Sequence, residues 1–243
     1  MWARAADPEV ERTWEQARLA FPEQGRVVTG ALGASLPQAA KTLAGRKLPV
    51  VVYLHGCSGL DSISSATAAF LAGAGYLVVS PDSFARLSKP ASCDVATHAS
   101  GLHRGVLAWR QAEAANAVAE VRRLPFVDPR RVYLYGFSEG AIAAATTVVA
   151  VRARIVEGWT CHAGWPEYAG IRFPASQPAL TLTSRDDPWF QADYARGDCS
   201  DVLRGRPGSR SIVFAPPDPL SGQHWVSSRQ DVQTTILDFL AAH

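Results

Sequence analysis

Short apolar runs alternate with alanine-rich or amphipathic segments along most of the chain. Continuous apolar runs indicate strands that are covered on both faces, as in parallel sheets. The predicted strands are 49–54, 76–80, 132–135, 155–159, 179–183 and 211–214. The segments with a helical pattern are 64–74, 108–124 and 227–242. Strands that alternate with helices predict an α/β fold, a mainly parallel twisted sheet with helices on both faces.

The pattern also suggests how the chain is divided. Residues 1–24 have a helical pattern, so we predict an N-terminal helical extension there and a single α/β domain over residues 25–243. Residues 25–37 indicate one or two edge strands, and the polar residues 38–48 indicate a loop. The connection at 83–107 is longer than an ordinary loop, which favours a functional role.

Composition restricts the function classes. The 243 residues are 47% hydrophobic and carry a formal charge of +2, which argues against a nucleic-acid or polyanion surface. No apolar run reaches the ~18 residues of a membrane span. The first residues lack the apolar core of a signal peptide, although a signal could have preceded them. Location therefore stays open between cytoplasm and periplasm or secretion, and the oligomeric state stays open as well.

A Gly-x-Ser-x-Gly sequence, formed by Gly136, Ser138 and Gly140, lies between a predicted strand and the alanine-rich segment 141–145. In a strand–turn–helix context this motif exposes the serine at the carboxyl edge of the sheet. Glycines allow the sharp turn and the close approach of neighbouring elements. The helix N-terminus favours a developing negative charge. We therefore predict that Ser138 is a nucleophile.

A serine nucleophile needs a base, which is usually a histidine. In proteins built around such an elbow, the acid and then the histidine follow the serine. Of six histidines, only His224 and His243 follow a plausible acid. His243 ends the chain, where fraying is expected. His224 follows the last predicted strand in a loop, so we predict that His224 is the base.

The acid should follow a late strand and hold the imidazole in one tautomer. Asp186 and Asp187 both follow the strand that ends at Thr183. We select Asp186 because it lies three residues past that end. Glu157, Glu167 and Asp218 are weaker alternatives.

An oxyanion also requires hydrogen-bond donors. One predicted donor is the backbone N–H of Glu139, directly after the nucleophile. The other is the N–H of Cys57, with Ser58 as an alternative, in the loop after the first long strand. His55 is interpreted as a structural residue that braces this loop.

Together these segments resemble the α/β-hydrolase superfamily, and within it the dienelactone hydrolase-like group. The matching segments are His55–Leu60, Ser80–Phe84, Phe126–Val132, the elbow, Asp186–Trp189 and His224. The enzymes that give the group its name use a cysteine nucleophile, whereas this chain has Ser138. The resemblance therefore implies a cofactor-free serine esterase with a small ester as substrate. It does not point to dienelactone itself.

Several side chains are candidates for a substrate pocket. Four tryptophans are predicted at or near the carboxyl-edge loops, where aromatic rings could line an apolar pocket or serve as ordinary packing: Trp159, Trp165, Trp189 and Trp225. We select the last three as pocket residues. Arg104 lies in the long 83–107 connection and could pair with an anionic substrate, as could Arg86.

The four cysteines show no Cys-x-x-Cys spacing, so no metal site is predicted. All four follow predicted strands on the same edge of the sheet. In the resembling fold the strands before Cys57 and Cys93 are neighbours, and so are those before Cys161 and Cys199. Two disulfides are therefore conceivable and would imply an oxidising compartment. Four reduced thiols are the alternative.

The leading interpretation is a serine carboxylic-ester hydrolase that acts through an acyl-enzyme on Ser138. A thioesterase or an acyl-peptide hydrolase would use the same three residues. A non-catalytic binding protein of the same fold is the alternative from another class. No nucleic-acid partner, membrane span, metal or cofactor is predicted.

Overall fold

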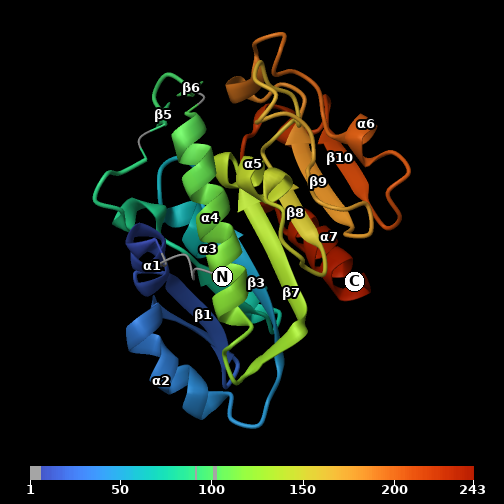
Figure 1. Cartoon of the computed structure of the whole chain (residues 1–243). Coiled ribbons are helices and arrows are strands. Elements are labelled where there is room, and N and C mark those ends of the chain that lie inside the picture. The colour runs from blue at the N-terminus through green and yellow to red at the C-terminus, as the bar shows by residue number, and fades with distance from the viewer. Residues whose placement is uncertain (1–6, 91, 101–102) are drawn as a thin grey trace.

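The computed structural model describes residues 7–90, 92–100 and 103–243 and contains an eight-stranded sheet in the order β10-β9-β8-β7-β3-β4-β1-β2 (Figure 1). The strands of this sheet are β1 (Arg18–Glu23), β2 (Arg26–Ala31), β3 (Leu48–Leu54), β4 (Leu77–Ser80), β7 (Val127–Phe137), β8 (Arg154–Glu157), β9 (Ala179–Ser184) and β10 (Arg210–Phe214). A separate two-stranded sheet is formed by β5 (Cys93–Asp94) and β6 (Ala99–Ser100).

The six strands from β10 to β4 are parallel, whereas β1 is antiparallel to both β4 and β2. Helices flank the sheet, with α4 and α5 on one side and α3 and α7 on the other (Figure 1). The helices are α1 (Pro8–Glu15), α2 (Leu32–Thr42), α3 (Ser62–Gly73), α4 (Arg104–Val121), α5 (Glu139–Thr146), α6 (Ser200–Leu203) and α7 (Gln230–Ala242). Short 3₁₀ turns lie at Ser83–Ala85, Pro188–Phe190, Pro219–Gly222 and Val226–Ser228. The predicted α/β fold is confirmed.

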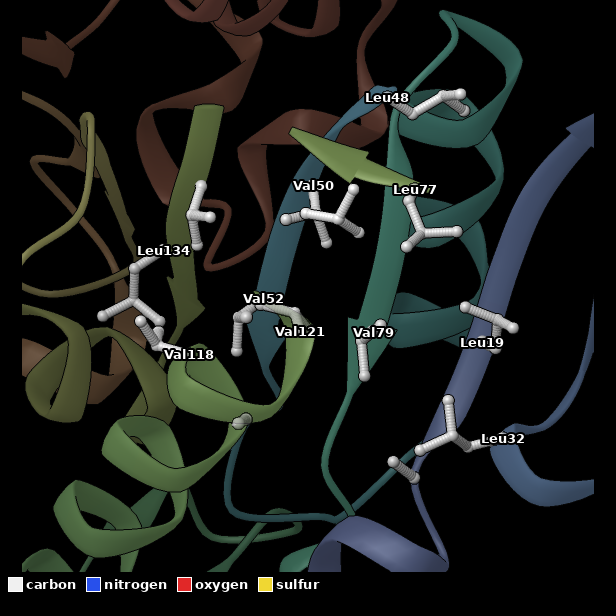
Figure 2. Packing of buried hydrophobic residues seen from close by; sticks show 14 of the residues in the cluster. Leu19, Leu32, Leu48, Val50, Val52, Leu77, Val79, Val118, Val121 and Leu134 are labelled. Atoms are coloured by element: carbon white, nitrogen blue, oxygen red, sulfur yellow. The ribbon is translucent and has the colours of Figure 1, made fainter. Parts of the chain in front are cut away.

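Strand β3 explains why both faces of the sheet need cover. Its side chains alternate between faces, so Val50 and Val52 pack in the cluster that includes Val118 of α4 (Figure 2). Val51 and Tyr53 belong to the opposite cluster, which α3 and α7 cover. A strand that is apolar on both faces is therefore held between two layers of helices.

Three expectations for connecting segments are wrong. Residues 18–23 are not helical, because they form β1 and pair with β2 and β4. The predicted extension thus ends its helix at Glu15, and the chain before residue 25 supplies a strand to the main sheet. Residues 38–42 continue helix α2 and are not a loop, and helix α4 begins at Arg104, within the predicted long connection.

No helix among the described residues is long and apolar enough to cross a membrane.

Candidate active site

The turn after β7 holds its central residue in an unusual backbone conformation. Ser138 has φ 56° and ψ −120°, a positive φ that is uncommon for a residue other than glycine. Its N–H donates to the Glu157 carbonyl oxygen at 2.8 Å, and helix α5 starts at the next residue. The serine is thereby presented at the carboxyl edge of the sheet.

The two glycines of the motif are required by close backbone contacts. A Cβ atom on Gly136 would lie 2.1 Å from the carbonyl oxygen of Gly140. A Cβ atom on Gly140 would lie 2.1 Å from the carbonyl oxygen of Leu54, at the end of β3. Any side chain at either position would push α5 away from the sheet and move the turn.

His224 lies beside this serine. Its Nε2 atom is 2.8 Å from Ser138 Oγ, and its Nδ1 atom is 2.6 Å from Asp187 Oδ2. A carboxylate can only accept, so the proton of the neutral ring is assigned to Nδ1. Nδ1–H then donates to the Asp187 carboxylate, and Nε2 accepts from the Ser138 hydroxyl. The arrangement could remove the serine proton and stabilise the imidazolium that results.

The acid beside His224 is therefore Asp187, and the selection of Asp186 is wrong. Asp186 is exposed, whereas the Asp187 side chain is only 2% exposed and also accepts from the Trp189 N–H at 3.0 Å. The physical reason is the length of β9, which continues to Ser184 rather than ending at Thr183. The residue three positions past the strand end is then Asp187.

Aromatic rings enclose the imidazole of His224 on several sides. The ring centroids of Phe137, Trp189 and Phe190 lie 5.1 to 5.8 Å from that of His224. His98, on the turn between β5 and β6, lies edge-on to Trp189 at 5.3 Å. This packing fixes the orientation of the imidazole and limits its contact with water.

A cavity of about 60 Å³ opens beside Ser138 and His224. Its walls are largely apolar and aromatic, with Ile142, Trp159, Tyr168, Trp189 and Phe190. Its polar lining consists of Cys57, Ser92, Ser100 and Glu139, together with the serine and the histidine. No arginine or lysine of the described residues lines it.

Of the predicted pocket residues, only Trp189 lines this cavity. Trp225 packs against the core beneath α7 and donates from Nε1 to Ser227 Oγ at 2.9 Å. Trp165 and Arg104 lie together in a separate, shallow hollow. The Arg104 guanidinium stacks 3.7 Å from the centre of the Trp165 ring and pairs with Glu167, so neither residue serves the cavity.

Five further lining residues were not predicted from the sequence: Phe190, Tyr168, Ile142, Ser92 and Ser100. Trp159 was considered but not selected. Phe190 had a visible signal, since it adjoins Trp189 in the segment after the predicted acid. The others come from α5, from the short strand β6 and from long loops, whose path no periodicity determines.

The two predicted oxyanion donors belong to residues at the same cavity. Glu139 is the first residue of α5, so its N–H has no acceptor within the helix. Cys57 lines the cavity, and the preceding Gly56 packs so closely that a Cβ atom there would lie 3.4 Å from Ser138 Cβ. Their role as oxyanion donors remains a prediction.

Comparison with known proteins places this chain in a family. Residues 36–198, more than half of the chain, match the family model described as the dienelactone hydrolase family. The chain belongs to the dienelactone hydrolase family.

Solved structures share the fold of this dienelactone hydrolase family member at low sequence identity. A candidate dienelactone hydrolase from Klebsiella pneumoniae is 16% identical with a TM-score of 0.60, covering 93% of this chain and 98% of that one. A dienelactone hydrolase-like promiscuous phosphotriesterase from metagenomic libraries is 19% identical with a TM-score of 0.58, covering 93% and 97%. A hyperthermophilic esterase from Pyrobaculum calidifontis is 16% identical with a TM-score of 0.54, covering 97% and 89%. A search of the curated proteins found no match.

A buried polar network supports the loop of the predicted donor Cys57. Arg110, from α4, donates to the carbonyl oxygen of His55 and, at 2.7 Å, to the hydroxyl of Ser83. His55 Nδ1 lies 2.6 Å from the Gly56 carbonyl oxygen, and His55 Nε2 lies 3.2 Å from the Ser83 nitrogen. Burial, together with the nearby Arg110 charge, lowers the pKa of His55 well below its ordinary value, so the ring is neutral. The contacts agree with the predicted bracing role of His55.

A buried carboxylate connects the elbow with the loop that carries His224. The Glu157 side chain accepts from the Ser227 N–H at 2.7 Å and from the Tyr135 hydroxyl at 2.5 Å. Its backbone carbonyl accepts from Ser138, so one residue ties both segments together. Burial raises the pKa of the Glu157 carboxyl.

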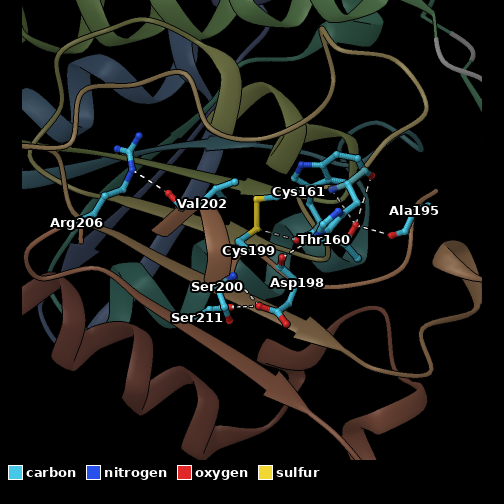
Figure 3. Close-up of a disulfide and its surroundings, with 11 residues drawn as sticks. Thr160, Cys161, Ala195, Asp198, Cys199, Ser200, Val202, Arg206 and Ser211 are labelled. Atoms are coloured by element: carbon cyan, nitrogen blue, oxygen red, sulfur yellow. Dashed lines mark hydrogen bonds between the residues drawn. A yellow bond between two sulfur atoms is a disulfide. The ribbon is translucent and has the colours of Figure 1, made fainter. Parts of the chain in front are cut away.

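Both conceivable disulfides are present. Cys57 and Cys93 are bonded with Cα atoms 6.0 Å apart. Cys161 and Cys199 are bonded with Cα atoms 5.1 Å apart (Figure 3). The residue before Cys161, Thr160, donates its hydroxyl to the Ala195 carbonyl oxygen. Among the described residues, no group of three or more His, Cys, Asp or Glu side chains could hold a metal ion.

The position of the acid gives a direct test. Asp187→Asn should lower kcat/KM by a factor on the order of 10⁴, because asparagine favours the wrong imidazole tautomer and cannot stabilise the imidazolium. Asp186→Asn is the matched control and should stay within about threefold of wild type, because that side chain is exposed. Steady-state kinetics on an activated ester measures both. Greater damage from the Asp186 change would move the acid back to that residue.

Proposed function

We propose that this dienelactone hydrolase family member is a serine carboxylic-ester hydrolase with Ser138, His224 and Asp187 as its catalytic triad. The proposal rests on one observation, the unbroken sequence of contacts from Asp187 through His224 to the hydroxyl of Ser138 at the mouth of an apolar cavity. Thioesterases and acyl-peptide hydrolases would use the same groups, but no feature of the cavity favours them.

The reaction follows from these contacts. Ser138 Oγ attacks the carbonyl carbon of the ester, and its proton passes to His224 Nε2. The carbonyl oxygen becomes an oxyanion, which the N–H groups of Glu139 and Cys57 would stabilise. The bond from carbon to the alcohol oxygen then breaks, and the alcohol leaves with the proton from Nε2.

Hydrolysis of the acyl-enzyme repeats the sequence with water. Water attacks the acyl carbon while Nε2 takes one of its protons. Collapse of the second intermediate breaks the bond to Ser138 Oγ, which receives that proton back from Nε2. The carboxylic acid is released, and the enzyme returns to its starting protonation state.

Replacement of the nucleophile tests the function. Ser138→Ala should lower kcat for p-nitrophenyl acetate by about 10⁴ to 10⁶ and abolish labelling by a fluorophosphonate, because no other described side chain is held against His224 as an attacking group. Circular dichroism and melting should match wild type. Retention of more than a tenth of wild-type turnover would refute the assignment, and a wild-type protein that neither labels nor hydrolyses would favour a binding protein.

The shape of the cavity supports a short, uncharged acyl group. The cavity of about 60 Å³ is walled by Ile142 of helix α5 and by aromatic rings, so a long chain would have to displace packed side chains. No arginine or lysine of the described residues lines it to pair with an anionic substrate. Arg86, suggested above for that role, instead pairs with buried Glu113 at 2.5 Å.

Acyl length should therefore control the rate. The kcat/KM for p-nitrophenyl acetate should exceed that for the octanoate by at least about tenfold, since overpacking costs about 1–3 kcal/mol. Ile142→Ala should reduce this ratio because it enlarges the cavity, whereas the exposed control Val148→Ala should leave the ratio unchanged. Equal or faster hydrolysis of the octanoate by wild type would contradict the short-acyl proposal.

The two disulfides support a location in an oxidising compartment outside the cytoplasm, because cytosolic reductants keep most thiols reduced. We include this location in the proposal. It accords with a pairing that uses all four cysteines of the chain.

Alkylation followed by intact-mass measurement tests the location. Protein from its native cells, denatured without reductant, should add no alkyl groups, and after reduction it should add four, because each cysteine is in a bridge. A Cys57→Ala/Cys93→Ala variant should add two after reduction, which calibrates the count. Four alkylated cysteines in the unreduced protein would exclude both bridges and the proposed location.

A further inference from the structure

Two adjacent residues in the connection between β4 and α4, Ser92 and Cys93, contact the residues of both proposed oxyanion donors. Ser92 donates its hydroxyl proton to the carboxylate of Glu139. Cys93 is bonded through sulfur to Cys57. One short piece of chain is therefore attached to Glu139 by a hydrogen bond and to Cys57 by a covalent bond.

The attachment to Glu139 is the main restraint on that side chain. Its carboxylate is 14% exposed and accepts, among the described residues, a hydrogen bond only from Ser92. Arg110 Nε is 3.9 Å from Glu139 Oε1, and neither of these two buried atoms has a hydrogen-bond partner within the described chain. Arg110 thus supplies attraction without fixing a geometry, and the directional contact comes from Ser92.

The attachment to Cys57 acts on a less constrained piece of backbone. Cys57 begins a turn after β3, outside any helix or strand. The carbonyl oxygens of the two preceding residues are hydrogen-bonded, that of Gly56 to the His55 ring and that of His55 to Arg110. The Cys57 side chain instead extends to Cys93. The disulfide therefore restrains Cys57 from a segment outside the main sheet.

We propose that Ser92 and Cys93 are positioning residues that hold the backbone N–H groups of Glu139 and Cys57 at a common spacing for the oxyanion. This inference rests on the proposed ester hydrolysis. Oxyanion donors are effective only within about 2.7–3.1 Å of the developing charge. A displacement of about 1 Å can cost on the order of 100-fold in rate.

The second disulfide provides a matched control. The two bridges close chain segments of similar length, with sequence separations of 36 and 38, so loss of either should reduce stability by a similar amount through the unfolded chain. Only the Cys57–Cys93 bridge reaches a proposed oxyanion donor. A difference in kinetics between the two double variants therefore reports positioning rather than stability.

The experiment compares Cys57→Ala/Cys93→Ala with Cys161→Ala/Cys199→Ala on p-nitrophenyl acetate, well below both melting temperatures. The first should lose about 10- to 100-fold in kcat with KM within about threefold, because the oxyanion is present only in the transition state. Its affinity for an alkylboronic acid, which forms a tetrahedral adduct on serine, should fall by a similar factor. The second variant should keep kcat within about twofold.

A single hydroxyl tests the other attachment while both disulfides stay intact. Ser92→Ala should lower kcat about 5- to 20-fold with little change in KM, and Ser92→Thr, which keeps the hydroxyl, should recover most of that loss. Ser88→Ala in the same connection is an exposed control and should match wild type.

Three results would overturn the inference: kcat above half of wild type in Cys57→Ala/Cys93→Ala, equal losses in the two double variants, or an unaltered kcat in Ser92→Ala. These results leave the proposed function standing as long as wild type labels with fluorophosphonate and Ser138→Ala is inactive. Absence of labelling and turnover in wild type would instead refute the proposed function.

Discussion

The candidate site depends on how closely helix α5 approaches the end of strand β3. This approach is possible only because Gly140 has no side chain, since a Cβ atom there would lie 2.1 Å from the Leu54 carbonyl oxygen. The contact brings the helix N-terminus and Ser138 next to the loop that begins at His55. Ser138 and the two proposed oxyanion donors therefore share one backbone junction, and a shift of the helix would move all three groups together.

A buried arginine from helix α4 holds this junction in place. On the α4 side, Arg110 is 1% exposed and hydrogen-bonds to the His55 loop. A buried guanidinium is costly unless it is paired and hydrogen-bonded. This one donates to the His55 carbonyl oxygen and to the Ser83 hydroxyl, and it lies 3.9 Å from the Glu139 carboxylate. The cost of burying it is offset only in the folded arrangement. The network therefore favours a single position of the loop over alternative packings of similar hydrophobicity.

The sequence predicted those parts of the site that local patterns determine. Strand runs, the elbow and the position of His224 after the last strand were sufficient for the fold and for the contact between Ser138 and His224. The predicted acid was placed one residue before the aspartate that contacts His224, because the end of β9 depends on pairing with its neighbours, which apolar content alone does not define. Trp165 and Trp225 were misassigned because an aromatic residue near a strand end can turn toward solvent, core or cavity, and only tertiary packing decides which.

The loop that carries His224 needs more than the contact with Asp187 to stay in place. It leaves the sheet after β10, whereas Ser138 follows β7, so two strands, β9 and β8, separate their origins. Glu157, in the adjacent strand β8, spans that separation, with its carbonyl oxygen on the Ser138 N–H and its carboxylate on Ser227. Burial disfavours the charged form of this carboxyl, yet three donors, among them the Tyr135 hydroxyl, satisfy it. A buried polar group that is fully satisfied specifies one arrangement, because each displacement of the loop leaves a donor or acceptor unpaired. The distance between Ser138 and His224 is therefore set by the interior of the sheet as well as by the contact between the two side chains.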